Sequence, residues 1–201
     1  SGADAVVVGA GLPLDLPELA ADHPHVALVP ILSDARGIAL VVKKWLRKGR
    51  APDAIVVEHP RYAGGHLGAA KIEDLSDPRF DFERVLPEAR AFLRTEGLED
   101  AVPLIPAGGI NSHERVRELF ALGASGVQLG TAFAVTAEGD ADIAFKRVLA
   151  DATPDDIVEF MSVAGLPARA VRTPSLYSYL KHLPKLAEAA RRKPRCTLKF
   201  D

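Results

Sequence analysis

Two apolar segments of strand length each end in residues that could bind a phosphate group. Gly108 and Gly109 follow the first segment, and Gly130 and Thr131 close the second. Glycine lets the main chain approach an anion closely because it has no Cβ, and amides exposed at strand ends and helix N-termini attract negative charge. Each of these turns is therefore a candidate phosphate ligand, with Thr131 contributing its hydroxyl or its amide.

A helix is predicted between the two turns, from Ser112 to Leu122. Asn111 is its predicted N-cap, because Glu114 follows at the spacing of a capping box. In a (β/α)8 barrel a phosphate group is usually bound by the loops after the seventh and eighth strands. The pattern predicts one phosphate site made by both turns, and the alternative is a pair of tight turns without a ligand.

A histidine lies in a glycine-rich loop directly after a third apolar segment, residues 54–58. The loop reads Tyr62-Ala-Gly-Gly-His-Leu-Gly68. Barrel enzymes place their chemistry at the carboxyl ends of strands, and an imidazole exchanges protons near neutral pH. His66 is therefore a candidate acid, base or hydrogen-bond donor, although a histidine that only orders its loop fits equally well. Gly64 and Gly65 could let the loop approach a flat ring, or could be ordinary turn residues.

The chain alternates between apolar segments of strand length and amphipathic segments of helix length. The predicted strands are Ala3–Val8, Val26–Leu32, Ala54–Glu58, Val102–Ala107 and Gly126–Gly130. The predicted helices are Leu16–Asp22, Ala35–Arg47, Phe82–Thr95, Ser112–Leu122 and Ile143–Ala150. Short connections between these segments predict an α/β fold with one parallel sheet and right-handed crossovers.

Two parts of the chain depart from this alternation. The segment 59–81 has no sustained periodicity, and a loop of that length in a compact domain is more often functional than ornamental. After Thr153 we expect helices without strands, ending in Leu176–Arg191. Five parallel strands would leave two edges unpaired, so the sheet is expected to be part of a larger barrel or an open, doubly wound sheet.

The composition excludes several classes of function. A formal net charge of −2 gives no electrostatic reason to expect nucleic acid or an anionic membrane as partner. One cysteine, Cys196, and the absence of a membrane-length apolar run fit a cytoplasmic location. The segment 6–11 begins like a dinucleotide fingerprint, but Leu14 replaces its third glycine. We expect no metal site and no hydrolase, because the sequence has neither zinc-type spacings nor a nucleophile elbow.

Four motifs together resemble the FMN-dependent nitronate monooxygenases, formerly called 2-nitropropane dioxygenases, and the related flavin-type enoyl-acyl-carrier-protein reductases. The motifs are Ala63-Gly-Gly-His66, Pro106-Ala-Gly-Gly-Ile110, Gly126-Val-Gln-Leu-Gly-Thr-Ala-Phe133 and Gly165-Leu-Pro-Ala-Arg169. They occur in the order and spacing of the family. The resemblance implies a TIM (β/α)8 barrel, of which residues 1–152 supply about strands four to eight and residues 153–201 a helical tail. The upstream third of the family's barrel, which has flavin contacts of its own, has no counterpart in this sequence.

The same resemblance implies that FMN is bound non-covalently, with His66 as the catalytic residue facing the flavin. The implied cofactor contacts are Gly64, Gly65, Ala107, Gly108, Gly109, Gln128, Gly130 and Thr131. Gln128 could face either the barrel interior or the helices. Tyr62 stands where many family members carry an acidic residue, and this departure leaves the substrate open.

The implied reaction is oxidation of an alkyl nitronate by O2 to a carbonyl compound and nitrite. One alternative keeps the flavin but uses NADH or NADPH to reduce an enoyl thioester or a quinone. A further alternative is a phosphate-binding barrel enzyme without flavin. The expected partners are thus a small substrate, O2, NAD(P)H for the reductase alternative, and the missing N-terminal segment of the barrel.

Overall fold

The computed structural model describes residues 2–9, 11–66 and 68–191, and its fold is α/β, as predicted. Cys196 lies outside these ranges. Four strands pair in parallel in the order β1-β2-β3-β5. They are β1 (Ala5–Val8), β2 (Ala27–Leu32), β3 (Ile55–Glu58) and β5 (Leu104–Ala107). Strands that are neighbours in this sheet are also successive along the chain, except that the short strand β4, which belongs to another sheet, comes between β3 and β5. This sequential order of parallel strands is that of one side of a barrel.

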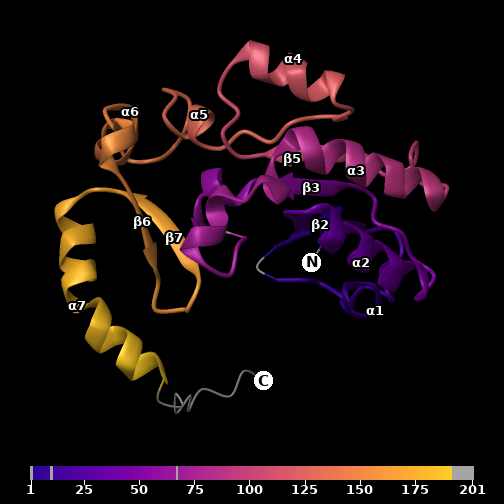
Figure 1. The fold of residues 1–201 in the computed structure, drawn as a ribbon, viewed down its shortest axis with the longest axis horizontal. Helices are drawn as coiled ribbons and strands as arrows, with labels where there is room; N and C mark the ends of the chain where they lie inside the picture. The colour runs from indigo at the N-terminus through magenta and orange to yellow at the C-terminus, as the bar shows by residue number, and fades with distance from the viewer. Residues whose placement is uncertain (1, 10, 67, 192–201) are drawn as a thin grey trace.

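Helices connect these strands and extend beyond the sheet (Figure 1). They are α1 (Leu16–Leu19), α2 (Ala35–Leu46), α3 (Phe82–Thr95), α4 (His113–Ala121), α5 (Thr131–Ala134), α6 (Ile143–Ala150) and α7 (Pro174–Arg191). The bounds of α3 and α6 are those predicted, and α5 was not predicted. The predicted cap at Asn111 is wrong, since Ser112 caps α4 by accepting a hydrogen bond from the Arg115 amide at 3.1 Å.

The core lies between one face of the sheet and helices α2 and α3. Trp45 of α2 and Leu86 of α3 are fully buried there together with Ile55 and Val57 of β3. We call this side of the sheet the helix face and the opposite side the open face. Side chains alternate along a strand, so Val56 and Glu58 lie on the open face. This face is incompletely covered in places, since Val7 of β1 is 56% exposed.

The predicted strand over residues 126–130 is wrong. Only one parallel bridge forms, between Ala107 and Gln128, and the Gln128 amide donates to the Pro106 carbonyl at 2.9 Å. This segment has glycine at both ends and β5 on one side, and no described strand pairs with its other side. A ladder therefore does not extend beyond the single bridge, and α5 begins directly after Gly130.

The prediction of helices without strands after Thr153 is also wrong. Strands β6 (Ile157–Met161) and β7 (Pro167–Val171) form an antiparallel hairpin, whose turn includes Gly165 at φ +75°. Strand β7 also pairs with β4 (Gly65–His66), so the hairpin reaches back to the glycine-rich loop. The final helix was predicted correctly as α7, and the proposed boundary at residue 152 stays a prediction.

The segment 59–81 has little regular structure, in agreement with its lack of periodicity. Besides β4 it forms the short 3-10 helices η1 (Pro60–Tyr62), η2 (Ile72–Ser76) and η3 (Pro78–Phe80). Its apolar residues Ala63, Ala69, Leu75 and Phe80 are buried together in a second, small cluster. Within the described ranges, no helix combines the length and the apolar character needed to cross a membrane.

Candidate functional site

Three polar and small residues form a row across the open face at its carboxyl edge. Glu58 of β3 is in register with Ala107 of β5, and Ala107 is bridged to Gln128. Residues in register on neighbouring strands share a face of the sheet. Val127 and Leu129 pack against the core on the helix face, so Gln128 between them points to the open side. The pairing therefore decides the orientation of Gln128, which the sequence left open.

The two glycine turns lie just beyond this row. Gly108 and Gly109 follow Ala107 with φ values of +98° and +70°, which side chains with a Cβ rarely adopt. Gly130 and Thr131 follow Gln128, and a Cβ built at Gly130 would meet no atom within 4 Å. Because Ala107 and Gln128 are bridged in parallel, both turns leave the sheet at the same edge. The structure thus brings the four predicted phosphate ligands to neighbouring positions.

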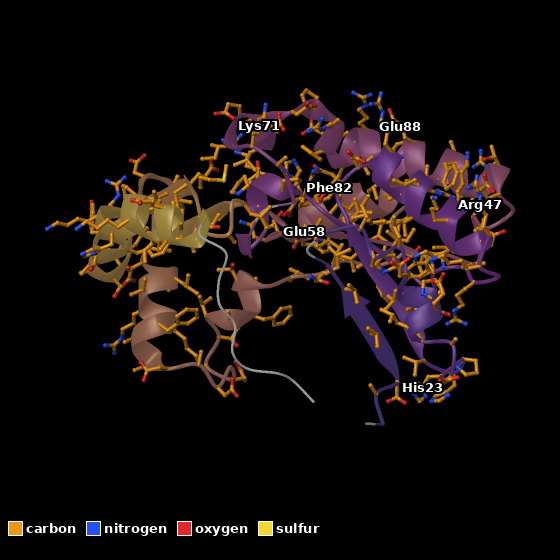
Figure 2. The ribbon with its side chains drawn as sticks, turned by 90° about the horizontal axis from the view of Figure 1, so that it is seen from below. His23, Arg47, Glu58, Lys71, Phe82 and Glu88 are labelled. Atoms are coloured by element: carbon orange, nitrogen blue, oxygen red, sulfur yellow. The ribbon has the colours of Figure 1, made fainter. Side chains whose placement is uncertain are left out.

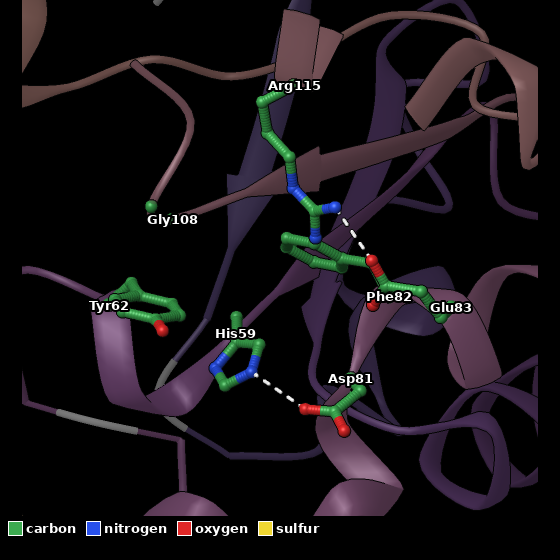
Figure 3. A pocket seen from close by; sticks show the side chains of 8 residues that line it. His59, Tyr62, Asp81, Phe82, Glu83, Gly108 and Arg115 are labelled. Carbon is green, nitrogen blue, oxygen red and sulfur yellow. Dashed lines mark hydrogen bonds and ion pairs between the residues drawn. The ribbon is translucent and has the colours of Figure 1, made fainter. Parts of the chain in front are cut away.

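Tyr62 packs against the first glycine turn. A Cβ at Gly109 would lie 2.9 Å from carbons of the Tyr62 ring, and one at Gly108 would lie 3.3 Å from the His59 carbonyl oxygen. The rings of Tyr62 and His59 are 4.8 Å apart between centroids. Figure 3 shows the Tyr62 ring next to Gly108 and the His59 ring beyond it, towards Asp81. The absence of side chains at the two glycines is therefore required by packing as well as by backbone conformation.

His59 lies on the helix face of the strand end, in a cavity of about 240 Å³. Its Nδ1 accepts a hydrogen bond from the Arg61 amide at 3.2 Å, and its Nε2 lies 3.5 Å from a carboxylate oxygen of Asp81. Burial lowers the pKa of His59 and outweighs the opposite effect of Asp81. His59 is therefore held towards its neutral form, with the proton on the nitrogen that faces Asp81.

An ion pair closes the other side of the same cavity. Arg115 of α4 donates to Glu83 of α3 at 2.7 Å, and this bond holds the pKa of Glu83 below its usual value. The Arg115 guanidinium also lies over the Phe82 ring, 5.8 Å from its centroid. These contacts join α3 to α4, and Figure 3 shows the Arg115–Glu83 ion pair beside the Phe82 ring. The residues that line this cavity therefore surround Gly108 and Gly109 on the helix side of the sheet.

Glu58 is a candidate functional residue that the sequence analysis did not select. It is half-buried at the end of β3 on the open face, and burial raises the pKa of its carboxyl group. Figure 2 shows Glu58 in the middle of the molecule, away from exposed charged residues such as Arg47 and Glu88. The available signal was its position as an acidic residue at the carboxyl end of a buried strand.

The loop that contains His66 runs along the same carboxyl edge. Gly65 is paired with Arg169 and His66 with Ala168, which places the backbone of both residues in β4. A side chain at Gly68 would collide with Ser33 Oγ, so the loop passes over the end of β2. Gly64 is exposed, with no atom within 4 Å of a built Cβ. The side chain of His66 lies outside the described part of the structure, and its catalytic role stays a prediction.

Comparison with known proteins agrees with the motifs found at this edge. A protein-family model described as "Nitronate monooxygenase" matches residues 1–193 of this chain. The chain belongs to the nitronate monooxygenase family. A protein of Bacillus subtilis named "Probable nitronate monooxygenase" is 30% identical over 131 residues, 65% of this chain and 35% of the relative. The nitronate monooxygenase of Pseudomonas aeruginosa is 33% identical over 99 residues, 48% of this chain and 25% of that protein.

Solved structures with a similar fold cover more of this chain than these sequence relatives do. FabK from Thermotoga maritima gives a TM-score of 0.69 at 24% identity, covering 93% of this chain and 52% of FabK. Nitroalkane oxidase from Streptomyces ansochromogenes gives 0.63 at 22% identity, covering 92% of this chain and 53% of that enzyme. These likenesses show the barrel type of fold, while the numbering of the strands as four to eight stays a prediction. This member of the family spans about a third of the B. subtilis relative and about half of these solved structures.

We predict that Gly109→Ala destabilises the protein by about 2–3 kcal/mol, because a positive φ and a steric clash with Tyr62 act together. Gly97→Ala is the matched control, since Gly97 has φ +73° but open space around a built Cβ. It should cost only about 1 kcal/mol. Urea unfolding of both variants measures the difference, and equal losses would show that the Tyr62 contact does not constrain the turn.

We predict that Glu58→Gln raises the melting temperature near pH 7.5. Because burial raises the folded-state pKa of Glu58 above the ordinary value of a glutamate, its ionised form is disfavoured in the native state. The gain should therefore vanish below about pH 4.5, grow as pH rises towards the folded-state pKa, and level off above it. Glu73→Gln removes an exposed carboxylate of η2 and serves as control. A gain for Glu58→Gln that does not change with pH would contradict a raised folded-state pKa of Glu58.

Proposed function

We propose that this chain forms the FMN-binding side of an oxidoreductase that oxidises alkyl nitronates. The observation that carries the proposal is the position of two glycine turns at one sheet edge, beside the loop that contains His66. In the family the corresponding motifs surround the flavin. The open face with its row of Glu58, Ala107 and Gln128 is then the wall of the cofactor pocket.

The residues present fit a flavin phosphate. Gly130 leaves the space beside its backbone free, and Gly108 and Gly109 are backed by Tyr62 on the far side. Amides of such turns can hold a phosphate without a competing side chain. Thr131 adds a hydroxyl at the same place. When bound, FMN would supply the electron transfer, while the protein supplies binding, orientation and electrostatics.

The roles of the remaining residues follow from their positions. Gln128 would donate and accept hydrogen bonds at the edge of the flavin ring, because its side chain starts from the open face. Gly64 and Gly65 would let the loop approach that ring. His66 would hold the nitronate by a hydrogen bond or take a proton from a nitroalkane, as an imidazole can do near neutral pH. The products would be a carbonyl compound and nitrite, with O2 as the oxidant.

Further barrel strands would complete this pocket. Val7 is 56% exposed on the open face, and no described strand pairs with the outer edge of β1. Parallel sheets are normally covered on both faces, and barrels have no free edges. We therefore include a segment with the first strands of the barrel among the partners, whether it belongs to the same polypeptide or to another.

The reaction is tested with the complete protein, in which the first barrel strands are present, loaded with FMN and mixed with propyl-2-nitronate without oxygen. We expect the visible absorbance of the flavin to bleach. His66→Asn should keep the flavin spectrum but lower kcat by about 100-fold, the usual contribution of a positioned acid or base. Bleaching by NADH or NADPH, with no response to the nitronate, would instead support a reductase. If the complete protein, with its first barrel strands present, is colourless and binds no FMN, both flavin functions are refuted.

The phosphate site is tested separately by Gly130→Ala. We expect FMN to bind at least about tenfold more weakly, because the new methyl group keeps the phosphate from the amide. The melting temperature of the ligand-free protein should not change, since a Cβ at Gly130 meets no atom. Gly126→Ala, also in open space at the other end of the segment, is the control. Unchanged FMN affinity in Gly130→Ala, measured by fluorescence titration, would remove this turn from the site.

A further inference from the structure

The β6–β7 hairpin holds the loop that contains His66, although about a hundred residues separate them. Strand β7 lies between β6 and β4, and pairs Arg169 with Gly65 and Ala168 with His66. Figure 1 shows the hairpin beside this part of the loop. Strand β4 has only two residues, so by itself this pairing is a weak constraint on the loop.

Arg169 adds a second connection between the same elements. Its Nη1 donates to the backbone carbonyl of Arg61 at 2.6 Å, across 108 positions in the sequence. A hydrogen bond from a guanidinium is stronger than one between neutral groups. Arg61 belongs to η1, and the next residue, Tyr62, packs against Gly109. The guanidinium therefore holds the loop at Arg61. This residue directly precedes Tyr62, which contacts the glycine turn, and lies upstream of His66.

The hairpin is itself braced by the C-terminal helix. The ring of Phe160 in β6 lies 5.7 Å from that of Tyr179 in α7, and the Tyr179 hydroxyl accepts from the Val163 amide at 3.2 Å. At the turn, the Ser162 amide donates to the Leu166 carbonyl at 2.9 Å. Arg169 thus projects from a strand that other contacts hold in place. Its hydrogen bond to Arg61 can therefore fix the position of the loop.

We propose that Arg169 is a positioning residue, which fixes the geometry of the His66 loop through the carbonyl of Arg61. The proposal rests on the proposed function for the role of His66, but the contact itself does not. If the contact is lost, the pairing of β4 with β7 alone must hold the loop. The loop should then open more often, and the reacting groups should be misplaced while the two glycine turns remain intact.

Arg172 provides a matched control. It lies three residues further along the chain and is exposed, just beyond the end of β7. Arg172→Ala removes the same charge from the same region but leaves the Arg61 carbonyl with its partner. Arg169→Lys keeps a cationic donor that can reach the carbonyl, and Arg169→Ala removes it.

Hydrogen exchange of the ligand-free full chain tests the contact. In Arg169→Ala we expect amides of residues 61–66 to exchange at least about tenfold faster, because one charge-assisted bond no longer opposes opening. Arg169→Lys should restore most of the protection, and Arg172→Ala should exchange like the parent protein. Unchanged exchange in Arg169→Ala, or equal acceleration in Arg172→Ala, would overturn the proposal.

Turnover by the FMN-loaded protein tests the consequence. Arg169→Ala should lower kcat by about tenfold, because misplaced reacting groups lose rate rather than affinity. FMN affinity should fall by less than kcat, since both glycine turns that would bind the phosphate are unchanged. A loss of FMN affinity with unchanged kcat would show a general structural role and reject positioning of His66. If no variant turns over nitronate, the proposed function fails, while the exchange result still decides the contact.

Discussion

One backbone hydrogen bond joins the two halves of the candidate site. The His59 amide donates to the Ala107 carbonyl at 2.9 Å, just beyond the paired ends of β3 and β5. It brings the start of the glycine-rich loop beside the start of the glycine turn. That bond fixes the chain three residues before Tyr62, which packs against Gly109.

Burial at the end of β3 acts on two neighbouring residues that point in opposite directions. Glu58 lies on the open face and His59 on the helix face, and burial raises the pKa of the first and lowers that of the second. Both shifts favour the neutral form. The strand end therefore carries less charge than its sequence suggests. A site for an anionic ligand benefits from weaker repulsion at Glu58, while neutral His59 keeps its hydrogen bond to the Arg61 amide.

The site depends on contacts between distant parts of the chain. The glycine-rich loop meets the glycine turn about 45 positions later and the hairpin about 100 positions later. Neither contact lies in the well-packed core between the sheet and helices α2 and α3. The core sets the strand order, while these peripheral contacts determine where the loop lies on the edge. Such a division is common in barrel enzymes, whose rigid sheet carries variable loops.

The sequence by itself determined the elements whose signals are local. Helix α3 has a continuous apolar stripe, and its predicted bounds are those observed. The positions of Gly108 and Gly109 after a buried strand predicted turns that need glycine, and both have positive φ. The family was also visible in the sequence, because its motifs are short and ordered. These features depend on residues within one turn or one strand, so the periodicity of side chains suffices to find them.

Only the tertiary structure decided features that depend on a partner elsewhere in the chain. Gln128 faces the open side because it is bridged to Ala107, and the same pairing is too short to make its segment a strand. Strand β7 forms between β6 and the loop, where the sequence indicated only helices. The role of Tyr62 as a support of Gly109 likewise required the two segments to meet. Strand pairing and packing are set by neighbours in space, and a single sequence does not specify which segments become neighbours.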